Sequence, residues 1–176
     1  QADYPAALRA RTCYTGGLCT TQADIPQRND ARRRLGLDPD REIILALTGG
    51  GGAGTPYAAL TVGARAAPDA LWIAIGPTLE EGHETDFANL LKLGWVDNVP
   101  DYLAAADIVI ASAGDNTIHE VARASGKLIV MPEWRYFSEQ HRKAAEEREN
   151  AAKVPGMLKP SQITEEDEEL VCVYDD

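Results

Sequence analysis

The sequence lacks several features that would indicate particular classes of protein. No apolar run approaches the roughly 18 residues that a transmembrane helix needs, and no charged and then apolar signal segment is visible at the N-terminus. There are three cysteines and no Cys-x-x-Cys pair, so neither a zinc site nor a disulfide framework is indicated. A reducing, cytoplasmic setting is therefore expected. The three histidines are scattered along the chain, and no metal site is expected.

Basic residues are scarce relative to acidic ones. The chain carries 28 Asp and Glu against 17 Lys and Arg, a formal net charge of −11. Residues 165–176 hold seven of these acids and no base. The remainder therefore carries 28 − 7 = 21 acids against 17 bases and is only mildly acidic. Because a phosphate backbone calls for a basic stripe, nucleic acid is not expected as a partner. The acidic stretch itself is expected to be a solvated tail or the exposed start of a helix.

Short apolar runs alternate with helical patterns along the 176 residues, whose length and 44% hydrophobic content suit one domain with its own core. Near-continuous apolar runs are typical of strands buried in a parallel sheet. The predicted strands are Glu42–Thr48, Leu71–Ile75, Leu91–Val96, Asp107–Ala111 and Lys127–Met131. Since helices separate them, we predict an α/β fold with a doubly wound, mostly parallel, Rossmann-like sheet.

The expected helices begin at capping residues or proline and end near glycine or proline. They run from Asn29 or Asp30 to Leu35, over Thr55–Ala67 and Pro100–Ala105, from Asp115 or Asn116 to Ala124, and over Ser138–Ala152. Residues 78–90 are interpreted as a loop or short helix. Tyr4–Thr21 is interpreted as a connecting segment or an edge strand, and Val171–Tyr174 as an edge strand or a disordered end.

A glycine-rich stretch, Gly49–Gly54, contains the spacing Gly-x-Gly-x-x-Gly between a predicted strand and a helix. Glycines there let backbone N–H groups approach a pyrophosphate, so a dinucleotide or a nucleotide-sugar satisfies the geometry; a glycine-rich turn without a ligand is the alternative. A nicotinamide dinucleotide also calls for an acid at the end of the second strand, where this chain has Ile75-Gly76-Pro77. The Gly-Lys-Ser/Thr of an ATP-binding P-loop is absent.

A strand-to-helix junction extends from Asp107 to Glu120. Gly114 permits a turn, and the helix start offers N–H groups and the positive end of its dipole to an anion. The carboxylate of Glu120 can accept hydrogen bonds from sugar hydroxyls; an ordinary junction with a surface glutamate is the plainer alternative. No Gly-x-Ser-x-Gly turn surrounds Ser112, which excludes a serine nucleophile of that kind, and His119 is expected to be a surface or packing residue.

Four elements are expected to share one crevice, because they all follow the carboxyl ends of strands in an open sheet. They are Gly49–Gly54, the turn Trp95-Val96-Asp97, the junction Gly114–Glu120, and Pro132–Gln140. Together they resemble the C-terminal, donor-binding domain of the GT-B glycosyltransferases of family 28, which includes the peptidoglycan lipid-intermediate N-acetylglucosaminyltransferase and glycolipid galactosyltransferases. The most specific matching stretches are Gly94–Asn98, Ala105–Glu120, and Glu139-Gln140 followed by Ala144.

The resemblance implies a role for each part of the crevice. The backbone at Val96 would pair with the edge of the base, normally uracil, and Glu120 would accept both ribose hydroxyls. The glycine loop and the following helix start would hold the two phosphates, while Glu139 and Gln140 would meet the donor sugar. The implied nucleotide-binding residues are Gly50, Gly51, Gly52, Val96, Gly114, Asn116, Thr117 and Glu120. Lys143 stands where the family usually has Asn, which leaves the sugar open.

The resemblance also implies an activity: inverting, metal-independent transfer of a hexosyl or N-acetylglucosaminyl group from a UDP-sugar to an unidentified acceptor. No cofactor is implied besides this donor substrate. The family's general base and acceptor site belong to an N-terminal domain that this chain lacks. The chain alone is therefore expected to be inactive and to need that acceptor-binding domain or a second subunit, through which peripheral membrane association would arise.

The domain organisation follows from these assignments. Residues 1–21 are predicted to be a connecting segment, 22–163 the donor-binding domain, and 164–176 an acidic tail. Two alternatives remain open at this point. One is a non-catalytic nucleotide-sugar-binding or regulatory interaction module, and the other is a nucleotide-sugar epimerase or hydrolase with a similar crevice.

Overall fold

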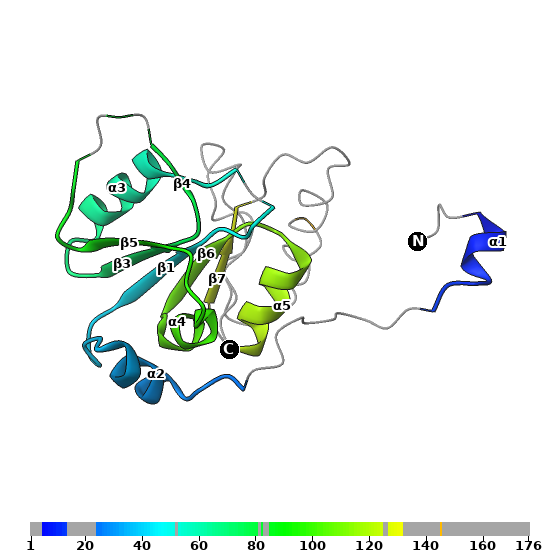
Figure 1. Ribbon diagram of the computed structural model, residues 1–176, viewed down its shortest axis with the longest axis horizontal. Coiled ribbons are helices and arrows are strands. Elements are labelled where there is room, and N and C mark those ends of the chain that lie inside the picture. Colours follow the sequence, from blue (N-terminus) through cyan, green and yellow to red (C-terminus); the bar gives the residue numbers. More distant parts are fainter. Residues whose placement is uncertain are drawn as a thin grey trace.

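A five-stranded parallel sheet organises the protein (Figure 1). The computed structural model describes residues 5–13, 24–51, 53–80, 82, 85–124, 127–131 and 145. The strands of the sheet are β1 Ile43–Leu47, β3 Leu71–Ile75, β5 Leu90–Gly94, β6 Ile108–Ala111 and β7 Lys127–Val130. They lie in the order β5-β3-β1-β6-β7 and every neighbouring pair is parallel. This is the doubly wound, Rossmann-like order, so the predicted fold class is confirmed.

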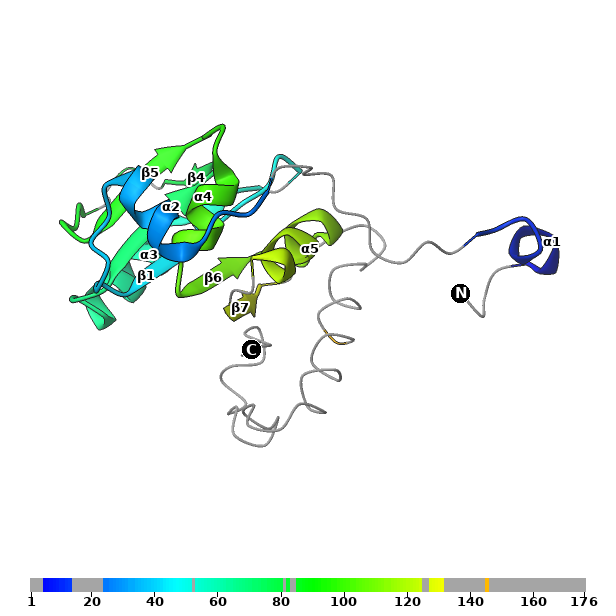
Figure 2. The same ribbon diagram turned by 90° about the horizontal axis from the view of Figure 1, so that it is seen from below.

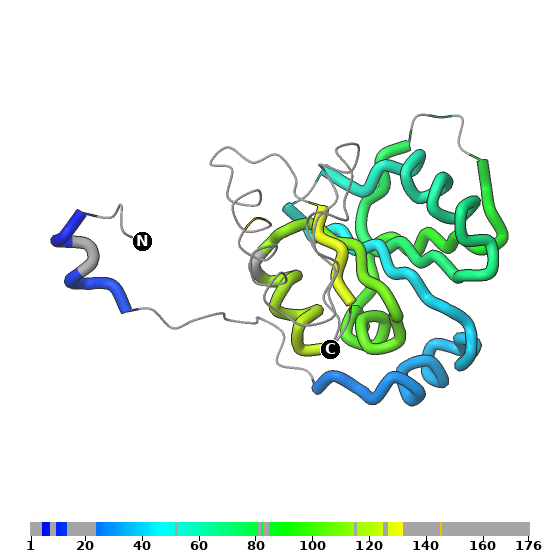
Figure 3. Tube along the Cα trace, turned by 180° about the vertical axis from the view of Figure 1, so that it is seen from behind, coloured from blue at the N-terminus to red at the C-terminus, as the bar shows by residue number. Residues whose placement is uncertain are grey.

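Helices cover both faces of the sheet (Figure 1). Helix α3, Tyr57–Ala66, lies on one face, whereas α2 Arg28–Leu35, α4 Val99–Ala105 and α5 Asp115–Arg123 lie on the other. Helix α4 packs beside α2 and α5 (Figure 2). The short helix α1, Ala6–Arg9, stands apart from the sheet (Figure 3) and falls in the stretch predicted to be a connecting segment. Within the described part of the chain, no helix is long and apolar enough to cross a membrane.

The central strands read as continuous apolar runs because both of their faces are buried. In β1, Ile43 and Leu45 pack into the core beneath α4 and α5, together with Val109. The alternating residues Ile44 and Ala46 pack into the core beneath α3. Each strand residue therefore enters one core or the other, which is the reason that this strand was recognisable from composition alone.

Strand β5 differs from its predicted range. It spans Leu90–Gly94, whereas Leu91–Val96 was predicted. Gly94 has a φ of 64°, a left-handed conformation that glycine adopts at little cost and that ends the extended backbone. Trp95 and Val96 consequently lie beyond the strand, in the connection to α4 at the carboxyl edge of the sheet.

The predicted start of the helix after the glycine loop is wrong. Thr55–Pro56 is a short strand, β2, which pairs in parallel with β4, Thr78–Leu79, and α3 begins at Tyr57. The N–H of Thr55 donates to the carbonyl oxygen of Pro77 at 3.0 Å, so tertiary pairing keeps this backbone extended. The loop or short helix expected over 78–90 contains β4, and the residues described there include no helix.

Two predicted helix caps are also wrong. The N-cap of α2 is Gln27, so Asn29 and Asp30 are helical residues, and Asp30 pairs with Arg33 on the helix surface. The N-cap of α5 is Gly114, with Asp115 as the first helical residue. Neither cap residue makes a side-chain capping bond. The cap of α5 is a backbone feature, in which the carbonyl oxygen of Gly114 accepts the N–H of Ile118 at 3.0 Å.

A buried arginine joins the elements at the amino edge of the sheet. Arg32 on α2 is 3% exposed and donates to the carbonyl oxygens of Ala105 and Arg41 at 3.0 and 3.1 Å. It also donates to Oδ2 of Asp107 at 2.7 Å, and the same oxygen accepts the N–H of Ile43 at 2.7 Å. Burial lowers the pKa of Arg32 from its usual value. This network ties β1 and β6 together at the edge opposite the glycine loop.

Several predictions fall outside the residues that the structure describes. They are the helix Ser138–Ala152, apart from residue 145, the strand Val171–Tyr174 and the acidic tail. The elements of the sheet and their flanking helices span Arg28–Val130. This span lies within the predicted domain 22–163, whose boundaries remain predictions.

Candidate functional site

The strand order reverses between β1 and β6 at the centre of the sheet, which makes this the switch point of the fold. The two strands are paired side by side, with Leu47 opposite Ala111 at their carboxyl ends. After β1 the chain leaves toward α3 on one face, and after β6 it leaves toward α5 on the other (Figure 1). Diverging connections of this kind open a crevice at the carboxyl edge, and ligands of open α/β sheets bind there.

The glycine loop and the start of α5 meet across this crevice. A Cβ atom built on Gly49 would lie 4.0 Å from Oγ1 of Thr117, and one built on Gly114 would lie 3.9 Å from the same oxygen. The Gly114 position is also 3.9 Å from Oγ of Ser112. Two stretches that are more than sixty residues apart in sequence therefore surround the Thr117 hydroxyl.

An exposed tryptophan extends the same edge toward β5. Trp95 is 68% exposed, more than any other large apolar side chain in the described part of the protein. A Cβ atom on Gly50 would lie 3.6 Å from its ring atom Cη2, so the indole flanks the glycine loop. The next residue, Val96, packs its side chain against the core beneath α4 and α5. The backbone at Val96, which is predicted to contact the base, is thus anchored beside the glycine loop.

The glycines at this edge fall into two groups. Gly54 and Gly76 have φ values of 115° and 92°, and a Cβ on Gly76 would lie 2.2 Å from the carbonyl oxygen of Thr48. The fold itself therefore requires glycine at both positions. Gly49 and Gly50 have no such φ, and added Cβ atoms would have room. The fold does not require glycine at either position, whereas a ligand that lies close to the backbone would.

Helix α5 presents its N-terminus to the crevice. By helix geometry, the N–H groups of Asp115, Asn116 and Thr117 have no acceptor within the helix. Asn116 is exposed and Thr117 is half-buried. Glu120 is half-buried and lies in the second turn of α5, which begins at Asp115.

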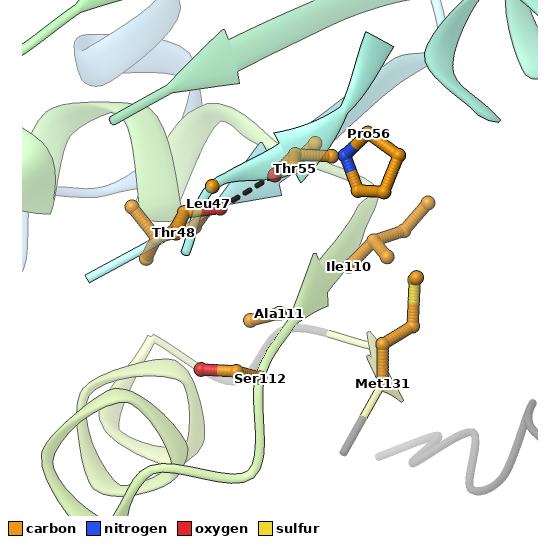
Figure 4. A pocket seen from close by; sticks show the side chains of 10 residues that line it. Leu47, Thr48, Thr55, Pro56, Ile110, Ala111, Ser112 and Met131 are labelled. Atoms are coloured by element: carbon orange, nitrogen blue, oxygen red, sulfur yellow. Dashed lines mark hydrogen bonds between the residues drawn. The ribbon is translucent and has the colours of Figure 1, made fainter. Parts of the chain in front are cut away.

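A cavity of about 200 Å³ lies at the carboxyl ends of β1 and β6 (Figure 4). Its walls are mainly apolar, with hydroxyl groups from Thr48, Thr55 and Ser112 at the carboxyl edge of the sheet. Residues from both ends of the glycine loop and from the ends of β1, β6 and β7 line it: Ala46, Leu47, Thr48, Gly54, Thr55, Pro56, Ile110, Ala111, Ser112 and Met131. None of the predicted nucleotide-binding residues that the structure describes lines this cavity, which adjoins the start of α5 only through Ser112.

The structure brings together most of the predicted site. Gly50, Gly114 and Thr117 lie around one crevice, with Gly51 exposed on the loop and Val96 beside Trp95. Gly52, Glu139 and Gln140 lie outside the described residues. Groups of three or more His, Cys, Asp or Glu side chains that could hold a metal ion are absent from the described part of the chain, and metal independence stays a prediction.

Sequence reasoning gave no role to Trp95, Thr48 or Thr55. Trp95 stood within a recognised motif, but its exposure is a property of the folded chain. The two threonines flank the glycine run, and that spacing was the available signal. Their hydroxyls share a hydrogen bond, which no local pattern indicates.

Comparison with known proteins gives a consistent family. The model of the glycosyltransferase family 28 C-terminal domain matches residues 57–166, more than half of the chain. A curated relative from Carboxydothermus hydrogenoformans is 27% identical over 146 residues, which are 76% of this chain. It is named UDP-N-acetylglucosamine–N-acetylmuramyl-(pentapeptide) pyrophosphoryl-undecaprenol N-acetylglucosamine transferase. The chain spans 39% of that relative's length.

Two solved structures are also similar to the chain. MurG from Acinetobacter baumannii is 20% identical, with a TM-score of 0.47 over 80% of this chain and 42% of that one. The glycosyltransferase SnogD from Streptomyces nogalater is 20% identical, with a TM-score of 0.39 over 69% of this chain and 31% of that one. The match to the family model carries the assignment: the chain belongs to the family of glycosyltransferase family 28 C-terminal domains.

Proposed function

We propose that this chain is the donor-binding part of a glycosyltransferase that moves a hexosyl or N-acetylglucosaminyl group from a UDP-sugar to an acceptor. The transfer inverts the anomeric centre and uses neither a metal nor a further cofactor. An acceptor-binding domain or second subunit completes the enzyme in the cytoplasm and brings it to the membrane surface. Because the named relative transfers N-acetylglucosamine, UDP-N-acetylglucosamine is the first donor to test.

One observation carries the proposal: the glycine loop meets the start of α5 at the switch point of a doubly wound sheet. Gly49 and Thr117 come close there, and neither Gly49 nor Gly50 is required by the backbone or by packing. A diphosphate needs close approach to backbone N–H groups and a positive electrostatic environment. The loop supplies the close approach, and the helix N-terminus supplies the N–H groups and the dipole.

Partners for the remaining parts of the UDP-sugar follow from the family resemblance. The carboxylate of Glu120 accepts hydrogen bonds from the two ribose hydroxyls, because an ionised carboxylate has two acceptor oxygens. The backbone at Val96 pairs with the edge of uracil, next to the exposed indole of Trp95. Glu139 and Gln140 contact the hydroxyls of the donor sugar.

The chemistry follows from this placement. An acceptor hydroxyl oxygen attacks the anomeric carbon in line, and the bond from that carbon to the diphosphate oxygen breaks. The electron pair leaves with UDP, whose developing charge is stabilised by the loop N–H groups and the α5 dipole. The acceptor proton passes to a general base on the completing domain, and this chain alone releases no product.

Titration calorimetry with UDP and with UDP-N-acetylglucosamine tests the proposal. We expect the chain to bind both, and the Glu120→Ala variant to bind UDP about tenfold or more weakly, because a hydrogen bond to a charged group contributes about 1.5 to 3 kcal/mol. Glu42→Ala is the matched control, since Glu42 is an exposed glutamate that precedes β1 at the opposite edge. Its UDP affinity should equal that of the wild type.

Two results would contradict the proposal. One is the absence of UDP binding by a folded wild-type chain, and the other is UDP binding that Glu120→Ala leaves unchanged. Thermal unfolding of each variant separates a local loss of affinity from a loss of folded protein. A folded monomer without nucleotide affinity would favour the alternative of an interaction module.

A further inference from the structure

Two threonines stand at the two ends of the glycine loop. Thr48 follows β1 and Thr55 begins β2, and their hydroxyl oxygens share a hydrogen bond in which either can donate (Figure 4). Thr48 is 5% exposed, and among the described residues it and Arg32 are the buried polar residues. The bond joins the two ends of Gly49–Gly54, the glycine loop or arch, and we refer to this pair as the threonine clip.

The clip is fixed to the rigid part of the sheet. The N–H of Thr48 donates to the carbonyl oxygen of Ile75 at 3.0 Å, and the N–H of Thr55 donates to that of Pro77 at 3.0 Å. Gly76 lies directly against the carbonyl of Thr48, where there is no room for a side chain. Both ends of the arch are therefore attached to the segment that follows β3.

The described residues near the middle of the arch have few side-chain contacts. Gly50, Gly51 and Ala53 are exposed, and the nearest neighbours of Cβ atoms on Gly49 and Gly50 lie at 4.0 and 3.6 Å. Because glycine has no side chain, Gly49 and Gly50 make no side-chain contact that could anchor the loop. The position of the loop consequently depends on how its two ends are joined.

Core stability does not explain why the clip is polar. Two valines would fill nearly the same volume, and replacing both partners of a buried hydrogen bond by apolar groups of the same shape is often close to neutral. A hydrogen bond differs from an apolar contact in that it fixes distance and direction. The polar clip thus sets the geometry of the arch.

We propose that Thr48 and Thr55 are positioning residues, which hold the glycine loop in the form that receives the diphosphate. They act through the loop backbone, whose N–H groups contact the ligand. A loop that is already ordered loses less conformational entropy on binding, so the clip raises affinity. This inference rests on the proposed function for its ligand, whereas its effect on the loop is independent of any ligand.

The experiment uses hydroxyl-deleting variants of nearly unchanged shape, Thr48→Val and Thr55→Val, in the full chain. In the free protein, amide NMR measures the order parameters of Gly51 and Ala53 and the hydrogen-exchange rate of the residue 55 amide. We expect the order parameters to fall and that exchange rate to rise about tenfold, with the amide of Ile73 in the core unchanged. UDP affinity measured by calorimetry should fall about five- to tenfold.

Two matched variants separate positioning from general loss of structure. Thr48→Ser keeps the hydroxyl and should retain the loop order and the UDP affinity of the wild type. Thr78→Val makes the same substitution in β4, the partner strand of Thr55, where the hydroxyl lies 3.4 Å from Oε1 of Glu80 and outside the clip. It should leave loop order and UDP affinity unchanged.

The inference is overturned if Thr48→Val and Thr55→Val leave the order of Gly51 and Ala53 unchanged, or if Thr78→Val disturbs the loop equally. It is also overturned if the loop loosens and UDP affinity stays at the wild-type value. If the wild-type chain binds no UDP, the proposed function fails, and the ligand-free NMR comparison still decides whether the clip orders the loop.

Discussion

Gly76 lies against the backbone of Thr48, so closely that a methyl group on Gly76 would stand 2.2 Å from the Thr48 carbonyl oxygen. Its φ of 92° is in addition a conformation that L residues rarely adopt. We therefore predict that Gly76→Ala destabilises the domain by about 2 kcal/mol or more. Urea denaturation followed by circular dichroism measures this loss, and a change below 0.5 kcal/mol, roughly the range of neutral surface substitutions, would contradict it.

Gly50 should respond in the opposite way. Gly50→Ala meets no atom closer than 3.6 Å, so we predict a change in unfolding free energy within about 1 kcal/mol. UDP affinity should nevertheless fall about tenfold, because a methyl group would occupy the space in which the loop approaches the phosphates. Calorimetry and denaturation on the same preparation measure both quantities. Equal UDP affinity in Gly50→Ala and wild type would argue against a phosphate at this loop.

Helix α3 packs closely against Trp72 at Gly63, which has no side chain. A Cβ on Gly63 would lie 2.4 Å from Cη2 of Trp72, which is 9% exposed and has little freedom to move. Although alanine is the better helix former, we predict that Gly63→Ala costs about 1 to 3 kcal/mol through overpacking. Trp72→Phe creates space at this contact, so the cost of Gly63→Ala should be smaller in that background. If Gly63→Ala lowers the unfolding free energy equally with Trp72 and with Trp72→Phe, the contact does not cause the loss.

The buried Arg32 makes Asp107 important for stability. Asp107→Ala removes an acceptor from the Arg32 guanidinium and from the N–H of Ile43, so we predict a loss of about 2 to 3 kcal/mol. Asp101→Ala is the comparison, since its partner Arg34 is 62% exposed; that ion pair contributes less than about 1 kcal/mol. Denaturation curves measured side by side distinguish the two, and similar losses would contradict the assignment.

The sheet was predictable because its central strands carry their own signal. Ile43–Leu47 and Leu71–Ile75 are buried on both faces, so the sequence is apolar at every position. Parallel order followed from the intervening helices. The resemblance to a family then placed the site at the carboxyl edge, and the order β5-β3-β1-β6-β7 agrees with that placement.

The errors arose where distant contacts override local patterns. Thr55-Pro56 resembles a helix start, but pairing with Thr78–Leu79 makes it a strand. Gly114 caps α5 with its backbone, although Asp115 and Asn116 are the side chains that usually cap helices. The bond between Thr48 and Thr55 likewise exists only because β1 and β2 are both held against the end of β3.

We predict that a uridine nucleotide binds between the glycine loop and the start of α5. Amide NMR spectra recorded during a titration with UDP test this most directly, because they locate the binding residues. We predict that the largest shift changes occur at Gly49, Gly50, Gly51, Val96, Gly114, Thr117 and Glu120, with little change at Arg32 and Asp107 on the opposite edge. No shift changes at millimolar UDP, or changes centred away from the glycine loop and α5, would contradict this binding site.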